Sequence, residues 1–392
     1  MPHVSLDTAA GSVDMQYFIA TPAKNDAHCI DPSRLTLVLI HSVYIGPEIF
    51  VAQFADPALR QCNLVAPVLR GHGETRGPPL EESYTHQEIA EDVALFMSAL
   101  QLPACHIVGL AVGANIAMEL AFAHSNLVTS LTLCSPLALK EPEGNIQARK
   151  EIINYWGDAF SVEGASSRQI PDMCIMQDAL YGSEQMTFSN RYSDIFSVRA
   201  VIKSSMNYAS NNWGPSPEKI TSASIIVNQW HTARPRSGSA AWRAFFAQIR
   251  QPVQIIHFDD DVPYPLPVCE EIASEFRAAG KHVPIHQVQG TCYGVLVSAS
   301  DVNPLIYRFV ASHSSPPLPS APPLPSAPPL PSAPPLSNGI PLATSFETPL
   351  GSPLGTPFDT RLSGYASLQN TSDDEDSDGD FTIHLGGGFA II

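Results

Sequence analysis

Short, continuously apolar segments alternate with helix-like segments through the first 313 residues, and this alternation constrains the fold more than any other feature. Residues 35–41 and 63–68 are apolar runs of strand length, and further strands are predicted at residues 106–110, 130–135, 252–257 and 283–288. A strand that is apolar on both faces is typical of a parallel sheet with helices on both sides. The strand–helix–strand order predicts the same α/β architecture, with a mostly parallel central sheet.

The clearest helix signal covers residues 85–102. Its apolar residues recur at helical spacing: Ile89, Val93, Phe96, Met97 and Leu100. Thr85 and Glu88 have the spacing of a capping box, which satisfies backbone N–H groups at a helix start. Further helices are predicted over residues 112–124 and 301–312.

The segment Gly109-Leu110-Ala111-Val112-Gly113 lies between a predicted strand and a predicted helix. This is the setting of a nucleophile elbow, a sharp turn that raises one side chain above the sheet. Its two glycines allow backbone and helix to approach closely. The central residue of such a turn normally carries the nucleophile, but here it is Ala111.

Three further segments, in the expected chain order, strengthen this interpretation. The run Arg70-Gly71-His72-Gly73-Glu74-Thr75 follows the second predicted strand, His257-Phe258-Asp259-Asp260-Asp261 follows the fifth, and Gly290-Thr291-Cys292-Tyr293-Gly294 follows the sixth. Together with His41 and the elbow, they make the chain resemble the α/β-hydrolase family of esterases and lipases over about residues 1–313. The resemblance implies a single domain with a helical lid.

The same resemblance implies roles for individual residues. The nucleophile position falls on Ala111 and the acid on Asp261, while the catalytic His position falls on Tyr293, or on Cys292 if the loop is one residue shorter. A methyl group cannot attack a carbonyl, and a Tyr is a poor base at neutral pH.

Backbone N–H groups of Val112 and of Ser42 or Val43 would form the oxyanion hole. His41 would line the pocket or position the loop. The resemblance therefore implies that the catalytic nucleophile and His are lost, while Gly109 and Gly113 preserve the elbow turn. Ala111 would then retain a strained, positive φ without a catalytic use. Asp261 could instead have a purely structural role.

Between about residues 138 and 237 the chain is more polar and shows no strong strand signal. We interpret this stretch as a lid inserted over the strand ends, with short helices at 147–160 and 197–208.

Residues 314–392 form a compositionally distinct tail, for which we predict disorder. Pro-Pro-Leu-Pro-Ser-Ala repeats begin at Pro316, Pro322 and Pro328, and an acidic run spans 373–380. In a polyproline II helix the repeat leucines share one face, as in ligands of WW-type domains. A semi-rigid spacer is the alternative interpretation.

Bulk properties exclude several classes of function. The net charge of −17 argues against nucleic acid and anionic membranes as main partners. The seven cysteines include no pair at metal-ligand spacing, so neither a metal nor a cofactor is expected. No run approaches the roughly 20 apolar residues of a membrane span. These features predict a reduced, cytoplasmic protein.

Three functional hypotheses remain at this point. The first is a catalytically impaired pseudo-hydrolase that binds a small apolar ligand, an ester-like molecule or a protein partner. The second is an active atypical esterase or lyase that uses Ser42 or the oxyanion hole alone. In the third, the folded part only carries the tail, and the tail acts as a scaffold that binds partners.

Overall fold

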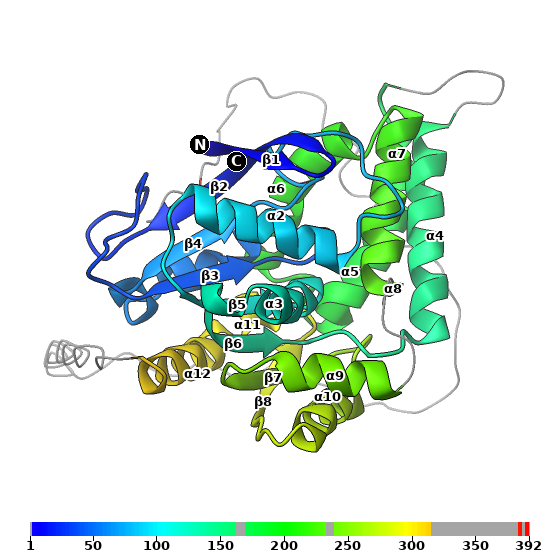
Figure 1. Cartoon of the computed structure of the whole chain (residues 1–392). Coiled ribbons are helices and arrows are strands. Elements are labelled where there is room, and N and C mark those ends of the chain that lie inside the picture. The colour runs from blue at the N-terminus through cyan, green and yellow to red at the C-terminus, as the bar shows by residue number, and fades with distance from the viewer. Residues whose placement is uncertain (1, 162–168, 233–238, 315–382, 386–388, 392) are drawn as a thin grey trace, which may run out of the picture. The chain divides into compact units, whose positions relative to one another are not determined.

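The computed structural model describes residues 2–161, 169–232, 239–314, 383–385 and 389–391 (Figure 1). Its centre is an eight-stranded sheet in the order β1-β2-β4-β3-β5-β6-β7-β8. The strands are β1 (His3–Thr8), β2 (Gly11–Ala20), β3 (Thr36–Ile40), β4 (Asn63–Pro67), β5 (Cys105–Leu110), β6 (Val128–Cys134), β7 (Val253–Asp260) and β8 (Ile285–Thr291).

The predicted parallel sheet is confirmed from β4 to β8. The sequence analysis did not anticipate β1 and β2, which pair antiparallel with each other and, through β2, with β4. Strands β3, β4 and β5 are buried along their whole length, because helices cover both faces of the sheet.

Two groups of helices cover these faces. Helix α2 (His86–Ala99) packs against α3 (Val112–Ala123), and α9 (Ser239–Gln248) packs against α10 (Leu266–Ala278). Helix α1 (Val51–Ala55) packs against α11 (Gly294–Val297) and α12 (Ala299–Ser312). The predicted capping box is present at the start of α2. The hydroxyl of Thr85 accepts from the Gln87 N–H, and the Glu88 carboxylate accepts from the Thr85 N–H at 2.7 Å.

The helical lid lies in sequence between β6 and β7. It comprises α4 (Glu143–Phe160), α5 (Met173–Tyr192), α6 (Phe196–Asn212), α7 (Pro217–Ser224), a π-helical turn (Ile225–Gln229) and α8 (Trp230–Thr232). Helices α4 and α5 pack against each other. The predicted helices 147–160 and 197–208 lie within α4 and α6, whereas α5 was missed.

Most of the predicted tail, including the Pro-Pro-Leu-Pro repeats, lies outside the described residues. Near the end of the tail, β9 (Ile383–Leu385) and β10 (Phe389–Ile391) pair antiparallel. The sequence analysis, which predicted disorder for the tail, did not anticipate this short hairpin. No helix in the described part of the chain is long and apolar enough to cross a membrane.

Candidate active site

The turn from β5 to α3 has the geometry of a nucleophile elbow. Ala111 has φ 47° and ψ −110°, a conformation that is costly for a residue with a Cβ. A Cβ at Gly109 would lie 2.3 Å from the Gly113 carbonyl oxygen, and one at Gly113 would lie 2.1 Å from the Ile40 carbonyl oxygen. Both glycines are therefore required, and the strained elbow persists with only a methyl group at its tip.

The oxyanion-hole donor beside the elbow is already engaged. The Val112 N–H donates to the Ser42 hydroxyl at 3.3 Å, and Ser42 is fully buried. The Val112 N–H, one of the expected oxyanion donors, therefore already has a side-chain partner. The carbonyl of Val43, the next residue, accepts a hydrogen bond from the Tyr293 hydroxyl at 2.6 Å.

His41 holds this loop in place and is not available as a base. Its Nε2 accepts from the Leu69 N–H at 3.0 Å, so the ring proton lies on Nδ1, which donates to the Ser42 carbonyl at 2.6 Å. Burial lowers the pKa of His41 well below its ordinary value, and the nearby His72 lowers it further. The ring is therefore neutral, and neither nitrogen is directed at the Ser42 hydroxyl.

Asp261 follows β7 and is buried beside the elbow. One carboxylate oxygen accepts from the Tyr264 N–H at 3.1 Å, and the other accepts from the Ser135 hydroxyl. Burial raises the pKa of Asp261 to about 7, although hydrogen bonds from Ser135 and Tyr264 partly oppose that effect. Without an imidazolium partner, this acid is partly protonated at neutral pH.

The two candidates for the catalytic His position face different partners. The Cys292 thiol lies 3.3 Å from the Ser135 hydroxyl and interacts with Asp261, on the acid side. The Tyr293 hydroxyl reaches Val43, on the oxyanion side. Burial raises the pKa of both groups well above their ordinary values, so neither serves as a base at neutral pH.

Ser135 is a site residue that the sequence analysis did not single out. Ser135 directly follows β6 and has φ 48°, and its hydroxyl joins Asp261 to Cys292. Its place at the end of a central strand was the available signal, since such ends converge on one edge of a parallel sheet.

Residues 36–286 match the sequence profile of the alpha/beta hydrolase fold family. The chain belongs to this family. It is 24% identical, over 261 residues, to the pimeloyl-[acyl-carrier protein] methyl ester esterase of Aromatoleum aromaticum, an alignment that covers 63% of this chain and 88% of that protein.

Solved structures of α/β-hydrolases share the fold. A thermophilic esterase from Thermogutta terrifontis has a TM-score of 0.57 at 13% identity, with 80% of this chain and 99% of that one covered. The enol-lactonase from Burkholderia xenovorans LB400 has a TM-score of 0.55 at 16% identity, with the same coverage.

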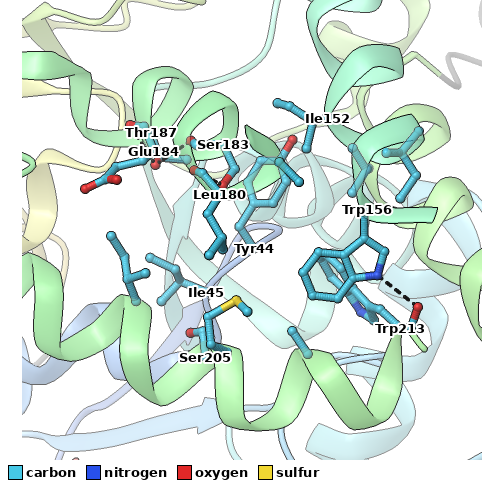
Figure 2. Close-up of a pocket in the computed structure, with 16 residues that line it drawn as sticks. Tyr44, Ile45, Ile152, Trp156, Leu180, Ser183, Glu184, Thr187, Ser205 and Trp213 are labelled. Atoms are coloured by element: carbon cyan, nitrogen blue, oxygen red, sulfur yellow. Dashed lines mark hydrogen bonds between the residues drawn. The ribbon is translucent and has the colours of Figure 1, made fainter. Parts of the chain in front are cut away.

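In this α/β-hydrolase, a mainly apolar cavity of about 50 Å³ lies among the lid helices (Figure 2). Its walls come from the lid helices and from Tyr44 and Ile45, which follow β3. The apolar lining includes Ile152, Ile153, Leu180, Ile202, Met206 and Val227. Ala111, Ser42 and Asp261 do not line it. A wider open groove of about 890 Å³ runs along the outer sides of α4 and α5.

In the described parts of the chain, no three His, Cys, Asp or Glu side chains gather as they would around a metal ion.

Proposed function

We propose that this protein is an α/β-hydrolase without hydrolytic activity that binds a small apolar ligand within its lid. The observation that carries the proposal is the elbow itself. Ala111 offers no nucleophile, and the Val112 N–H beside it donates to the Ser42 hydroxyl.

Three requirements of acyl transfer are unmet at this site. A nucleophile is absent at Ala111, a base is absent at Cys292 and Tyr293, and a protein hydroxyl occupies the oxyanion donor. In hydrolases, loss of triad members removes several orders of magnitude in rate and leaves mainly the contribution of the oxyanion hole. In this proposal the oxyanion hole cannot contribute either, because the Val112 N–H already donates to the Ser42 hydroxyl.

Ser42 does not rescue the chemistry as an alternative nucleophile. Both ring nitrogens of the adjacent His41 are committed to backbone partners, and the buried ring is neutral. Activation of a serine requires a base within hydrogen-bonding reach of its hydroxyl. The Tyr293 hydroxyl bonds to Ser42, but burial raises the Tyr293 pKa well above its ordinary value, so it is not a base at neutral pH. The Ser42 hydroxyl also accepts from the Val112 N–H, which removes the donor that would stabilise a tetrahedral intermediate.

The lid cavity is the ligand site in this proposal. Its apolar walls favour an apolar molecule, because burying apolar surface stabilises a complex by roughly 25 cal/mol per Å². At about 50 Å³ the cavity is smaller than a typical ligand site of roughly 300–1,000 Å³. Binding therefore requires α4, α5 and α6 to separate.

Ester turnover and ligand binding test the two halves of the proposal. With p-nitrophenyl butyrate, we expect the wild-type rate to equal that of the Ser42→Ala variant and of heat-denatured protein. Turnover that depends on Ser42 would overturn the proposal.

Binding of α-methylstyrene is measured through the fluorescence of Trp156 and Trp213, which line the cavity. Ala209→Leu places extra volume in the cavity and should weaken binding at least tenfold. The matched control Ala148→Leu adds the same volume in the open groove and should leave binding unchanged. Equal effects of the two variants would place the ligand elsewhere.

A further inference from the structure

Tyr44 stands among the cavity residues with its ring between the lid helices (Figure 2). It lies in the loop after β3 and has φ 68°. A bulky side chain is rare in this region of backbone space, where the conformation costs roughly 1–2 kcal/mol. The loop thus holds an aromatic ring against the lid at an energetic cost.

The Tyr44 hydroxyl is buried and has no hydrogen-bond partner among the residues that the structure describes. Burying a hydroxyl without a partner costs roughly 1–3 kcal/mol, and buried polar groups in proteins are normally paired. Tyr44 therefore combines a strained backbone with a buried hydroxyl that lacks a hydrogen-bond partner among the described residues.

The other N–H and O–H donors of the cavity wall are already used. Trp156 donates from its indole to the Trp213 carbonyl at 3.0 Å, and Trp213 donates to Gly71 at 2.8 Å. The three wall hydroxyls also donate within the protein, Ser183 to Leu180, Thr187 to Ser183 and Ser205 to Glu48. Tyr44 is left as the donor that a ligand in this cavity would meet.

The charges around the cavity disfavour an anionic ligand. Glu184 lines the cavity and contributes a carboxyl group, and burial raises its pKa. The nearby guanidinium of Arg149 is neutralised by Glu141, with an N–O distance of 2.6 Å. Among the described residues, no Lys or Arg side chain lines this cavity, and a ligand carboxylate would meet Glu184.

We propose that the lid cavity takes a neutral, mainly apolar molecule with one carbonyl oxygen, and that this oxygen accepts a hydrogen bond from the Tyr44 hydroxyl. The inference rests on the proposed function, since it names the ligand class of the same cavity. Tyr44 is a ligand-binding residue in this proposal, with no role in bond breaking.

The test uses two probes of nearly equal shape with the full chain. Acetophenone carries a carbonyl where α-methylstyrene carries a methylidene group. Tyr44→Phe removes only the hydroxyl, and a hydrogen bond is worth about 1 kcal/mol net. We expect the variant to bind acetophenone about fivefold more weakly and α-methylstyrene with unchanged or higher affinity. Retained α-methylstyrene binding also shows that the variant is folded.

Each other outcome has a distinct meaning. Equal changes for both probes would overturn the role of Tyr44 and leave the apolar site standing. If neither probe binds the wild-type protein, the proposed function fails first, and this inference fails with it. Benzoate tests the charge argument, because tighter binding of benzoate than of acetophenone would contradict a neutral ligand class.

Discussion

Asp261 illustrates what happens to a catalytic residue when its partners change. In a working triad the acid is ionised beside a histidine that gains a proton. Here its neighbours are the neutral Ser135 and Cys292 groups, and burial raises its pKa to about 7. Hydrogen bonds keep the carboxyl in place, but they stabilise its charge too little to offset the effect of burial.

A buried acid with a raised pKa makes stability depend on pH. Between about pH 4 and pH 7 the folded state holds a proton that the unfolded state has released, so stability falls as pH rises through this window. The fall should amount to roughly 4 kcal/mol in total. Roughly 2.7 kcal/mol of this fall lies between pH 5 and pH 8. Urea unfolding at these two pH values measures it, and Asp261→Asn should remove most of it. The control Asp259→Asn changes an exposed neighbour and should retain the wild-type pH slope.

The strain at Ala111 has a consequence for stability. Ala111→Gly relieves the positive φ, whereas Ala114→Gly removes a methyl group from regular helix in α3. We expect Ala111→Gly to be more stable than Ala114→Gly by at least about 1 kcal/mol, as measured by denaturant unfolding. Equal losses in the two variants would mean that Ala111 is not strained in solution.

For individual residues, the sequence allowed a prediction where the residue belongs to a motif of fixed spacing. The strained turn between Gly109 and Gly113 could be anticipated, and Asp261 could be proposed as the acid, because strand ends and spacing indicate these positions. The choice between Cys292 and Tyr293 could not be made, since a shift of one residue turns a side chain toward different neighbours. Tyr44 could not be identified either, because its partners come from helices far away in sequence.

At the scale of elements, the loop after β4 is anchored to α2 by a buried ion pair. The Arg70 guanidinium donates to Asp92 at 2.8 and 3.3 Å, and the Tyr84 hydroxyl donates to the same carboxylate. Arg70 and Asp92 are each 4% exposed. This contact explains the Arg70-Gly71-His72-Gly73 segment structurally, without a catalytic role.

Breaking this pair from one side should be costly. Asp92→Ala leaves the Arg70 charge buried without its partner, and we expect a loss of about 3–5 kcal/mol in the free energy of unfolding. The double variant Arg70→Met/Asp92→Leu removes both charges and should recover much of the loss. A double variant as unstable as the single one would argue that packing, and not charge, sets the cost.

Elements with strong local signals were predicted within a few residues, as in the capped helix α2 and the fully apolar strands β3 and β5. Helix α5 was missed because only a few of its side chains are buried, at scattered positions such as Met176, Ala179 and Phe188. Its residues therefore lack the apolar periodicity that marks a helix packed on a sheet.

At the scale of the whole molecule, the lid cavity is lined by other residues than the elbow. Tyr293 contacts both regions, since its hydroxyl donates to Val43 and its ring packs edge-on against Phe188 of α5 at 5.8 Å. The Tyr293 N–H also donates to the Thr187 carbonyl at 3.0 Å. The loop that holds the catalytic His in active relatives thus ties the lid to the oxyanion loop. The fold class could be predicted from sequence, but the cavity depends on lid packing that no local pattern encodes.

The central claim is that the elbow region carries no reactive nucleophile. The most direct measurement treats the full-length, native protein with an alkyl fluorophosphonate and records its intact mass. We predict no adduct, because Ala111 stands at the nucleophile position and Ser42 has no base to activate it. A stoichiometric adduct that disappears in Ser42→Ala or Ser135→Ala would contradict the account and show that the site remains an active one.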